Sequence, residues 1–150
     1  MRRYELKAET MRLWGVMAML IMALSLGACG GAPAGAGVTE AGAIAASLPD
    51  TVEVQTVAQL KGQDDVVLLD VREPSEYAEG HIPGVALIPM GEVPNRLSEI
   101  PKDKTVIVTC RSGNRSGQIA EYLRQQGYDD VHNMKGGILA WQDAGLPVEK

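Results

Sequence analysis

Two uninterrupted apolar runs constrain the fold of this chain more than any other feature of its sequence. The first is Val66–Asp70 and the second is Thr105–Thr109, and both are rich in β-branched residues. A strand that is apolar along its whole length is typically buried on both faces, as in a parallel sheet covered by helices. Helical stretches separate these runs along the chain, so the sequence predicts an α/β domain.

Shorter patterns complete the predicted alternation of strands and helices. Pro74 suits the first turn of a helix, and Gly127 suits the end of one. The predicted architecture has three layers, α/β/α, around a mainly parallel sheet of about five strands, for which about 100 residues suffice. We expect strands at 52–55, 66–70, 86–88, 105–109 and 130–132, and helices at 56–61, 74–79, 92–99, 116–126 and after Gly136.

The candidate site is the loop after the second apolar run, Cys110-Arg111-Ser112-Gly113-Asn114-Arg115, which leads into a helix opened by Ser116. Backbone N–H groups of such a loop and of a helix start point inward and favour negative charge. The same field favours a thiolate, and the pKa of a cysteine falls from about 8.5 to between about 3.5 and 7.5 in such surroundings. Sites in open parallel sheets lie at the carboxyl ends of strands, where Cys110 falls. The alternative is a free cysteine that only packs at the strand end.

The first 28 residues have the pattern of a secretory signal. Basic residues between positions 2 and 12 precede an apolar stretch at 13–26, and small residues precede Cys29. Leu26-Gly27-Ala28-Cys29 resembles a bacterial lipobox, which implies removal of residues 1–28 and lipidation of Cys29. The alternative is an uncleaved anchor helix, although a bilayer-spanning helix needs about 20 apolar residues. Both interpretations place the domain in the cell envelope, outside the cytoplasmic membrane, on its periplasmic or extracellular face.

Residues 29–49 are expected to form a flexible tether, because their Gly- and Ala-rich beginning cannot bury enough apolar surface to fold. The folded domain is then expected at 50–150. Removal of four basic and two acidic residues with 1–28 leaves 10 basic and 17 acidic residues, a net charge of −7. This balance argues against nucleic acid as a partner and makes the lipid the expected contact with the membrane. Two cysteines and two histidines cannot supply a structural zinc set, so we expect no metal and no cofactor.

The domain resembles a single-domain rhodanese, a sulfurtransferase module. The resemblance spans residues 52 to 148, and its motifs occur in the order found in that family. It implies a rhodanese-like α/β/α fold over the whole domain and says nothing of the tether. The motifs are Leu69-Asp70-Val71-Arg72, Glu76-Tyr77, Gly80-His81-Ile82-Pro83-Gly84-Val85, the loop at 110–116, and Gly136-Gly137-Ile138 with Ala140-Trp141.

The resemblance implies that Cys110 is the nucleophile and carries sulfur as a persulfide. The donor would be a small compound such as thiosulfate, and the acceptor a cyanide-like ion or a thiol, including a thiol on a protein. Arg115 would close the loop, and Arg111 would face the entrance and attract an anionic donor. The substrate-binding residues that the resemblance implies are Arg111, Ser112, Gly113, Asn114 and Arg115.

Loop length separates this activity from that of phosphatases and arsenate reductases with the same fold, whose loops are one residue longer. Four residues lie between Cys110 and Arg115, which is the shorter, sulfur-type loop. A further alternative is a module that binds or carries sulfur without turnover.

Other polar residues near the loop are expected to be structural. Asp70 would hold loop backbone or Arg72, and Arg72 with Glu76 would form an ion pair that fixes a turn. His81 would hydrogen-bond locally, and Trp141 would lie in the core.

Overall fold

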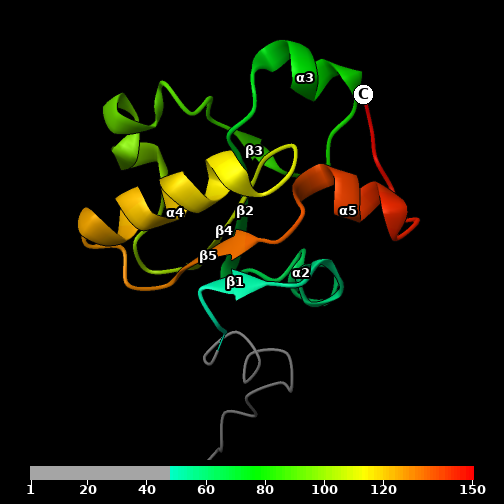
Figure 1. The fold of residues 1–150 in the computed structure, drawn as a ribbon. Helices are drawn as coiled ribbons and strands as arrows, with labels where there is room; N and C mark the ends of the chain where they lie inside the picture. The colour runs from blue at the N-terminus through cyan, green and yellow to red at the C-terminus, as the bar shows by residue number, and fades with distance from the viewer. Residues whose placement is uncertain (1–47) are drawn as a thin grey trace, which may run out of the picture. The chain divides into compact units, whose positions relative to one another are not determined.

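The computed structural model describes residues 48–150, so the expected signal segment, the lipidation site Cys29 and nearly all of the tether lie outside the described residues. A five-stranded sheet in the order β1-β5-β4-β2-β3 forms the centre of the domain, and every neighbouring pair is parallel (Figure 1). This confirms the predicted fold class. The strands are β1 (Thr51–Val52), β2 (Val66–Asp70), β3 (Ala86–Leu87), β4 (Thr105–Thr109) and β5 (Val131–Met134).

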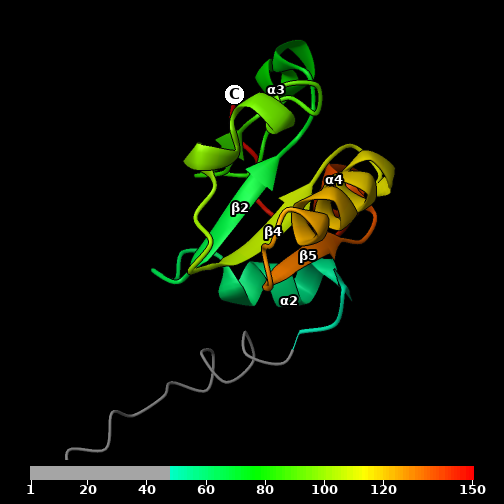
Figure 2. The same ribbon diagram turned by 90° about the vertical axis from the view of Figure 1, so that its left-hand side faces the viewer.

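Helices cover both faces of this sheet. Helix α4 lies on one face, whereas α2 and α5 lie on the other (Figures 1 and 2). Within residues 48–150, no helix combines the length and apolar character needed to cross a membrane. The helices are α2 (Val54–Leu60), α3 (Pro74–Glu79), α4 (Asn114–Gln125) and α5 (Gly137–Asp143), with 3-10 turns at Val93–Asn95 and Leu97–Glu99.

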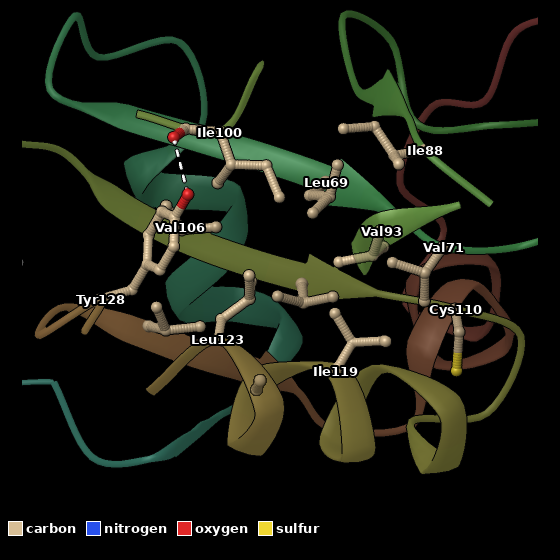
Figure 3. Packing of buried hydrophobic residues seen from close by; sticks show 13 residues of the cluster. Leu69, Val71, Ile88, Val93, Ile100, Val106, Cys110, Ile119, Leu123 and Tyr128 are labelled. Atoms are coloured by element: carbon tan, nitrogen blue, oxygen red, sulfur yellow. Dashed lines mark hydrogen bonds between the residues drawn. The ribbon is translucent and has the colours of Figure 1, made fainter. Parts of the chain in front are cut away.

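The two central strands supply side chains to a hydrophobic core on each face. On the α4 face, Leu69 of β2 and Val106 of β4 pack with Ile119 and Leu123 of the helix (Figure 3). The next residues along the strands, Leu68 and Ile107, join the opposite core, because successive side chains of a strand point to opposite faces. All five residues of β4 are buried, as expected for a strand covered on both sides.

Several predicted elements differ from the structure in their bounds. Helix α4 begins at Asn114 rather than at Ser116, so Asn114 and Arg115 lie on the helix, and β5 extends to Met134. The strand expected at 52–55 ends at Val52, and α2 begins at Val54, because Val54, Val57 and Leu60 lie at helical spacing and all bury against the sheet. The helix expected at 92–99 is instead two 3-10 turns.

Pro101 removes one hydrogen bond that an α-helix continuing past this segment would need. In an α-helix the carbonyl of Leu97 would accept the N–H of residue 101, and a proline has none. The hydroxyl of the buried Tyr128 donates to that carbonyl at 2.6 Å, and the N–H of Ile100 donates to it at 3.1 Å. The segment therefore folds inward and buries Ile100 (Figure 3).

Candidate functional site

The candidate nucleophile, Cys110, lies at the carboxyl end of β4 beside the start of α4 (Figure 3). Gly113 adopts a left-handed conformation, with φ of 95°, and turns the chain back so that the backbone N–H of Gly113 donates to Cys110 Sγ at 3.2 Å. The hydroxyl of Ser116 also lies against this sulfur, at 3.4 Å. Cys110 is 1% exposed, so its sulfur meets almost only loop and helix atoms.

The surroundings of Cys110 favour its thiolate. Burial raises the pKa of the thiol, but the Ser116 hydroxyl and the backbone N–H groups of Ser116, Ser112 and Gly113 hydrogen-bond to the sulfur and together lower the pKa below its ordinary value. Hydrogen bonds to the charged form of a group stabilise that form. The geometry therefore agrees with the predicted anion-favouring loop, and the donors are backbone and hydroxyl groups rather than an ionised base.

The glycine pair before α5 packs directly on the back of the loop. The N–H of Ile138 donates to the Cys110 carbonyl at 2.8 Å, and that of Leu139 donates to the Arg111 carbonyl at 3.2 Å. Gly137 has a φ of 58°, and a Cβ at this position would lie 2.6 Å from the carbonyl carbon of Arg111. Only glycine fits this contact, which directs the loop carbonyls toward α5 and away from the sulfur.

Arg115 joins the loop to α3 through an ion pair that the sequence did not predict. Its guanidinium donates to both carboxylate oxygens of Glu76, each at 2.7 Å. The hydrogen bonds from Arg115 hold the pKa of Glu76 well below its usual range, at about 2. A bidentate contact of this kind fixes orientation as well as distance. Arg115 thus links the start of α4 to α3, and its implied role in closing the loop stays a prediction.

The predicted ion pair between Arg72 and the Glu76 carboxylate is wrong. The guanidinium of Arg72 instead pairs with the Asp70 carboxylate at 2.7 Å, and both side chains are buried. It reaches α3 only through backbone, donating to the carbonyls of Glu76 at 3.0 Å and Gly80 at 2.9 Å. The expected structural role of Asp70 agrees with this arrangement, since its carboxylate is fully engaged at the end of β2.

The remaining polar candidates also have structural contacts. His81 Nδ1 hydrogen-bonds the carbonyl of Tyr77 at 3.1 Å, and the two rings stack with centroids 3.7 Å apart. Nε2 of His81 lies 3.3 Å from a carboxylate oxygen of Glu149. Trp141 is buried in the core, where its indole N–H donates to the carbonyl of Pro147 at 2.8 Å. These contacts agree with the expectations for His81 and Trp141.

Sequence reasoning missed Asn133, which lies on β5 next to the loop. Its Oδ1 accepts the hydroxyl of Ser116 at 2.6 Å, and its Nδ2 donates to the carbonyl of Gly113 at 3.1 Å. The available signal was its position, because a polar residue at the carboxyl end of the strand beside β4 belongs to the same edge of the sheet. Asn133 therefore contacts two of the three residues whose hydrogens face Cys110, Gly113 and Ser116; the third is Ser112.

A pocket of about 300 Å³ opens beside the loop, between α3 and α5. Arg111 lines this pocket, whereas Cys110 is not among the lining residues. Ser112 and Asn114 are exposed outside it. Within residues 48–150, no three His, Cys, Asp or Glu side chains gather closely enough to hold a metal ion. The lining residues are Arg72, Glu76, Glu79, Gly80, Arg111, Ile138, Leu139 and Gln142.

Comparisons with known proteins agree on one family. The profile of the rhodanese-like domain matches residues 53–144. A protein of Allochromatium vinosum named sulfurtransferase is 48% identical over 98 residues, which cover 65% of this chain and 92% of the relative. The thiosulfate sulfurtransferase GlpE of Pseudoalteromonas translucida is 34% identical over 93 residues, which cover 62% of this chain and 89% of that relative.

Solved structures show the same fold. The crystal structure of a rhodanese-related protein from Thermoplasma volcanium superposes with a TM-score of 0.62 at 31% identity, covering 67% of this chain and 98% of that one. A rhodanese-like domain protein from Staphylococcus aureus gives a TM-score of 0.60 at 33% identity, covering 68% and 100%.

Proposed function

This chain belongs to the rhodanese-like family, and on that premise we propose that it is a sulfurtransferase that carries sulfur as a persulfide on Cys110. One observation carries the proposal. The sulfur of Cys110 is enclosed by hydrogen-bond donors, which lower its pKa, while no carboxylate or imidazole hydrogen-bonds to it within the described residues. Such a sulfur is a nucleophile that needs no general base, because the thiolate is already favoured.

The proposed reaction has two displacements at sulfur. The Cys110 thiolate attacks the outer sulfur of thiosulfate, forming an S–S bond as the donor's own S–S bond breaks and sulfite leaves with the electron pair. An acceptor nucleophile, such as cyanide or a thiolate, then attacks the outer sulfur of the persulfide. That step breaks the Cys110 S–S bond and returns the thiolate, so no external oxidant or reductant is needed.

The loop contributes electrostatic stabilisation to both steps. Backbone N–H groups that face Sγ stabilise the thiolate that leaves in the second step, which is the role of a preorganised donor set. Arg111 lines the adjacent pocket and provides positive charge for an anionic donor. Arg115 is paired with Glu76, so its proposed role is to keep the loop closed rather than to contact the substrate.

A thiosulfate:cyanide assay tests the function, with Cys110→Ser as the matched control. We expect thiocyanate formation by the wild-type chain and none by the variant. After exposure to thiosulfate alone, mass spectrometry should show Cys110 heavier by one sulfur atom. An adduct without turnover would replace this proposal by that of a non-turnover sulfur carrier. Hydrolysis of a phosphomonoester or reduction of arsenate, without any sulfur adduct, would overturn both.

We further propose that the domain works in the cell envelope on a lipid anchor at Cys29. The support is the lipobox-like Leu26-Gly27-Ala28-Cys29 after a basic and apolar segment. Replacing Cys29 with alanine should abolish labelling by a radioactive or clickable fatty acid and block maturation. Membrane fractionation of the wild-type chain without any label would instead indicate an uncleaved anchor helix.

A further inference from the structure

We propose that Asn133 is a positioning residue that holds the hydrogen of Ser116 while Cys110 Sγ is uncharged and releases it to Sγ when the thiolate forms. The reason is a competition for one hydrogen. The Ser116 hydroxyl has a single hydrogen and two neighbours that can accept it, Asn133 Oδ1 at 2.6 Å and Cys110 Sγ at 3.4 Å. It cannot donate fully to both at once.

The orientation of the Asn133 amide is fixed by its second contact. Nδ2 donates to the carbonyl of Gly113 at 3.1 Å, and an amide nitrogen has hydrogens whereas that carbonyl has none. Oδ1 must therefore face Ser116, and there it can only accept. While Sγ is uncharged, the shorter distance places the hydroxyl hydrogen on the Asn133 side and leaves a lone pair of the Ser116 oxygen toward the sulfur. The hydrogen bond from Ser116 that lowers the pKa of Cys110 is the one made to the thiolate.

This arrangement suits a sulfur that carries no charge. In a thiol, S–H can donate to the Ser116 oxygen. In a persulfide the negative charge resides on the outer sulfur, and Sγ needs no strong donor. When the outer sulfur leaves, Sγ becomes a thiolate, and hydrogen bonds to charged groups are stronger than neutral ones. Rotation of the buried Ser116 hydroxyl then transfers its hydrogen bond from Asn133 to Cys110.

Asn133 therefore competes with the thiolate and favours the uncharged forms of Sγ. Its contact with Gly113 does not reverse this effect, because the Gly113 carbonyl also accepts the N–H of Gly117 at 3.1 Å and keeps its place without Asn133. A neutral hydrogen bond contributes about 1 kcal/mol net, equivalent to about a fivefold change in an equilibrium constant. Removing Asn133 should therefore increase the thiolate-to-thiol ratio of Cys110 about fivefold.

The charged groups around Cys110 come from several elements and are the same in every variant below. Arg111 follows Cys110 in the loop, and Arg115 of α4 is paired with Glu76 of α3. The buried Asp70–Arg72 pair lies at the end of β2. The nearest titratable group of β5, His132, hydrogen-bonds Asp130 and Pro49, and the part of α5 that contacts the loop has no charged residue.

The test measures the rate of Cys110 alkylation by iodoacetamide against pH in the full-length chain, so it needs no sulfur donor. Asn133→Leu should move the midpoint of the profile to lower pH by an amount equivalent to about fivefold, and Ser116→Ala should move it to higher pH. In the double variant, the Asn133 substitution should add nothing to the Ser116 effect. Asn95→Leu, on an exposed 3-10 turn, makes the same chemical change away from the site and should leave the midpoint in place.

An unchanged or raised midpoint in Asn133→Leu would overturn the inference, as would an equal shift with and without Ser116. Asn133→Ala repeats the measurement should the leucine variant fail to fold. The statement about Sγ in the persulfide rests on the proposed function, whereas the statement about the thiol and the thiolate does not. In the loaded protein, loss of Asn133 should speed sulfur transfer to cyanide. Absence of any persulfide would refute the function but leave the alkylation result to decide the role of Asn133.

Discussion

Replacing Glu76 with glutamine should destabilise the domain in a way that disappears at low pH. Glutamine keeps the size of the side chain and can still accept the N–H of Glu73, which Glu76 accepts at 3.1 Å as part of the capping box of α3. What it loses is the charge that faces Arg115 and one of the two oxygens that accept from its guanidinium. The substitution therefore isolates the ion pair that ties α3 to the cysteine loop.

The structure sets the size of this effect. The pKa of Glu76 falls from 4.5 to about 2 chiefly because of hydrogen bonds from Arg115. Each pKa unit corresponds to about 1.4 kcal/mol, which gives a ceiling of about 3 kcal/mol. The side chains of Arg115 and Glu76 are 32% and 27% exposed, and solvent-exposed pairs contribute only about 0.2 to 1 kcal/mol. We therefore expect a loss of about 1 to 2 kcal/mol at pH 7, between these limits.

The pH dependence follows from the direction of the shift. A carboxylate whose pKa is lowered on folding contributes its stabilisation above the unfolded-state pKa, near 4.5, and loses it as pH falls toward 2. Urea unfolding of wild type and Glu76→Gln should therefore differ most at pH 6–7, differ less at pH 3 and converge at about pH 2. Glu99→Gln, in the more exposed pair with Arg96, is the matched control and should show a smaller difference. A Glu76 difference that is constant across pH would refute the reasoning.

Three further predictions concern residues around the loop. Asp70→Asn should lower the free energy of unfolding by about 3–5 kcal/mol in urea titrations, because it leaves the buried Arg72 charge without its partner; a loss below about 1 kcal/mol would contradict this. Gly137→Ala should destabilise the domain by about 2 kcal/mol or more and slow alkylation of Cys110, because its positive φ and close approach to the loop exclude a Cβ. Arg111→Gln should raise the KM for thiosulfate severalfold, with little change in kcat and a weaker dependence on ionic strength, in steady-state assays; a fall in kcat alone would argue against a binding role.

The features predicted well from the sequence are those in which several consecutive residues favour the same structure. The apolar run at 105–109 must be a buried strand, and the thiol that follows it must lie at the sheet's carboxyl edge. Contacts between residues far apart in the sequence were harder to predict. Arg115 pairs with Glu76, 39 positions away, while Arg72 is four positions from Glu76 and was the more obvious partner. The path of the chain at α3 determines which arginine pairs with Glu76. The backbone carbonyl of Glu76 faces Arg72, whereas its carboxylate faces Arg115.

The same reasoning explains why Asn133 and the turns at 93–99 escaped prediction. An asparagine in a short strand is unremarkable until the strand order places β5 beside β4, and that order is a property of the whole sheet. The turns at 93–99 depend on Tyr128, whose hydroxyl takes the Leu97 carbonyl from 31 positions away. Both are long-range hydrogen bonds, which leave no periodic pattern in the sequence.

The strand order also determines when the cysteine acquires its chemistry during folding. β1, the first strand to be synthesised, pairs only with β5, so Thr51 must wait for Asn133 before the sheet can close. Two of the residues that contact the loop, Asn133 and Gly137, come from the same late segment. Until residues 131–138 have docked, the carbonyl of Cys110 lacks the N–H of Ile138 and the hydroxyl of Ser116 lacks its acceptor Asn133, so the surroundings of the thiol are incomplete. The full surroundings of Cys110 therefore form as a last step, and a native alkylation profile reports that the chain has folded to completion.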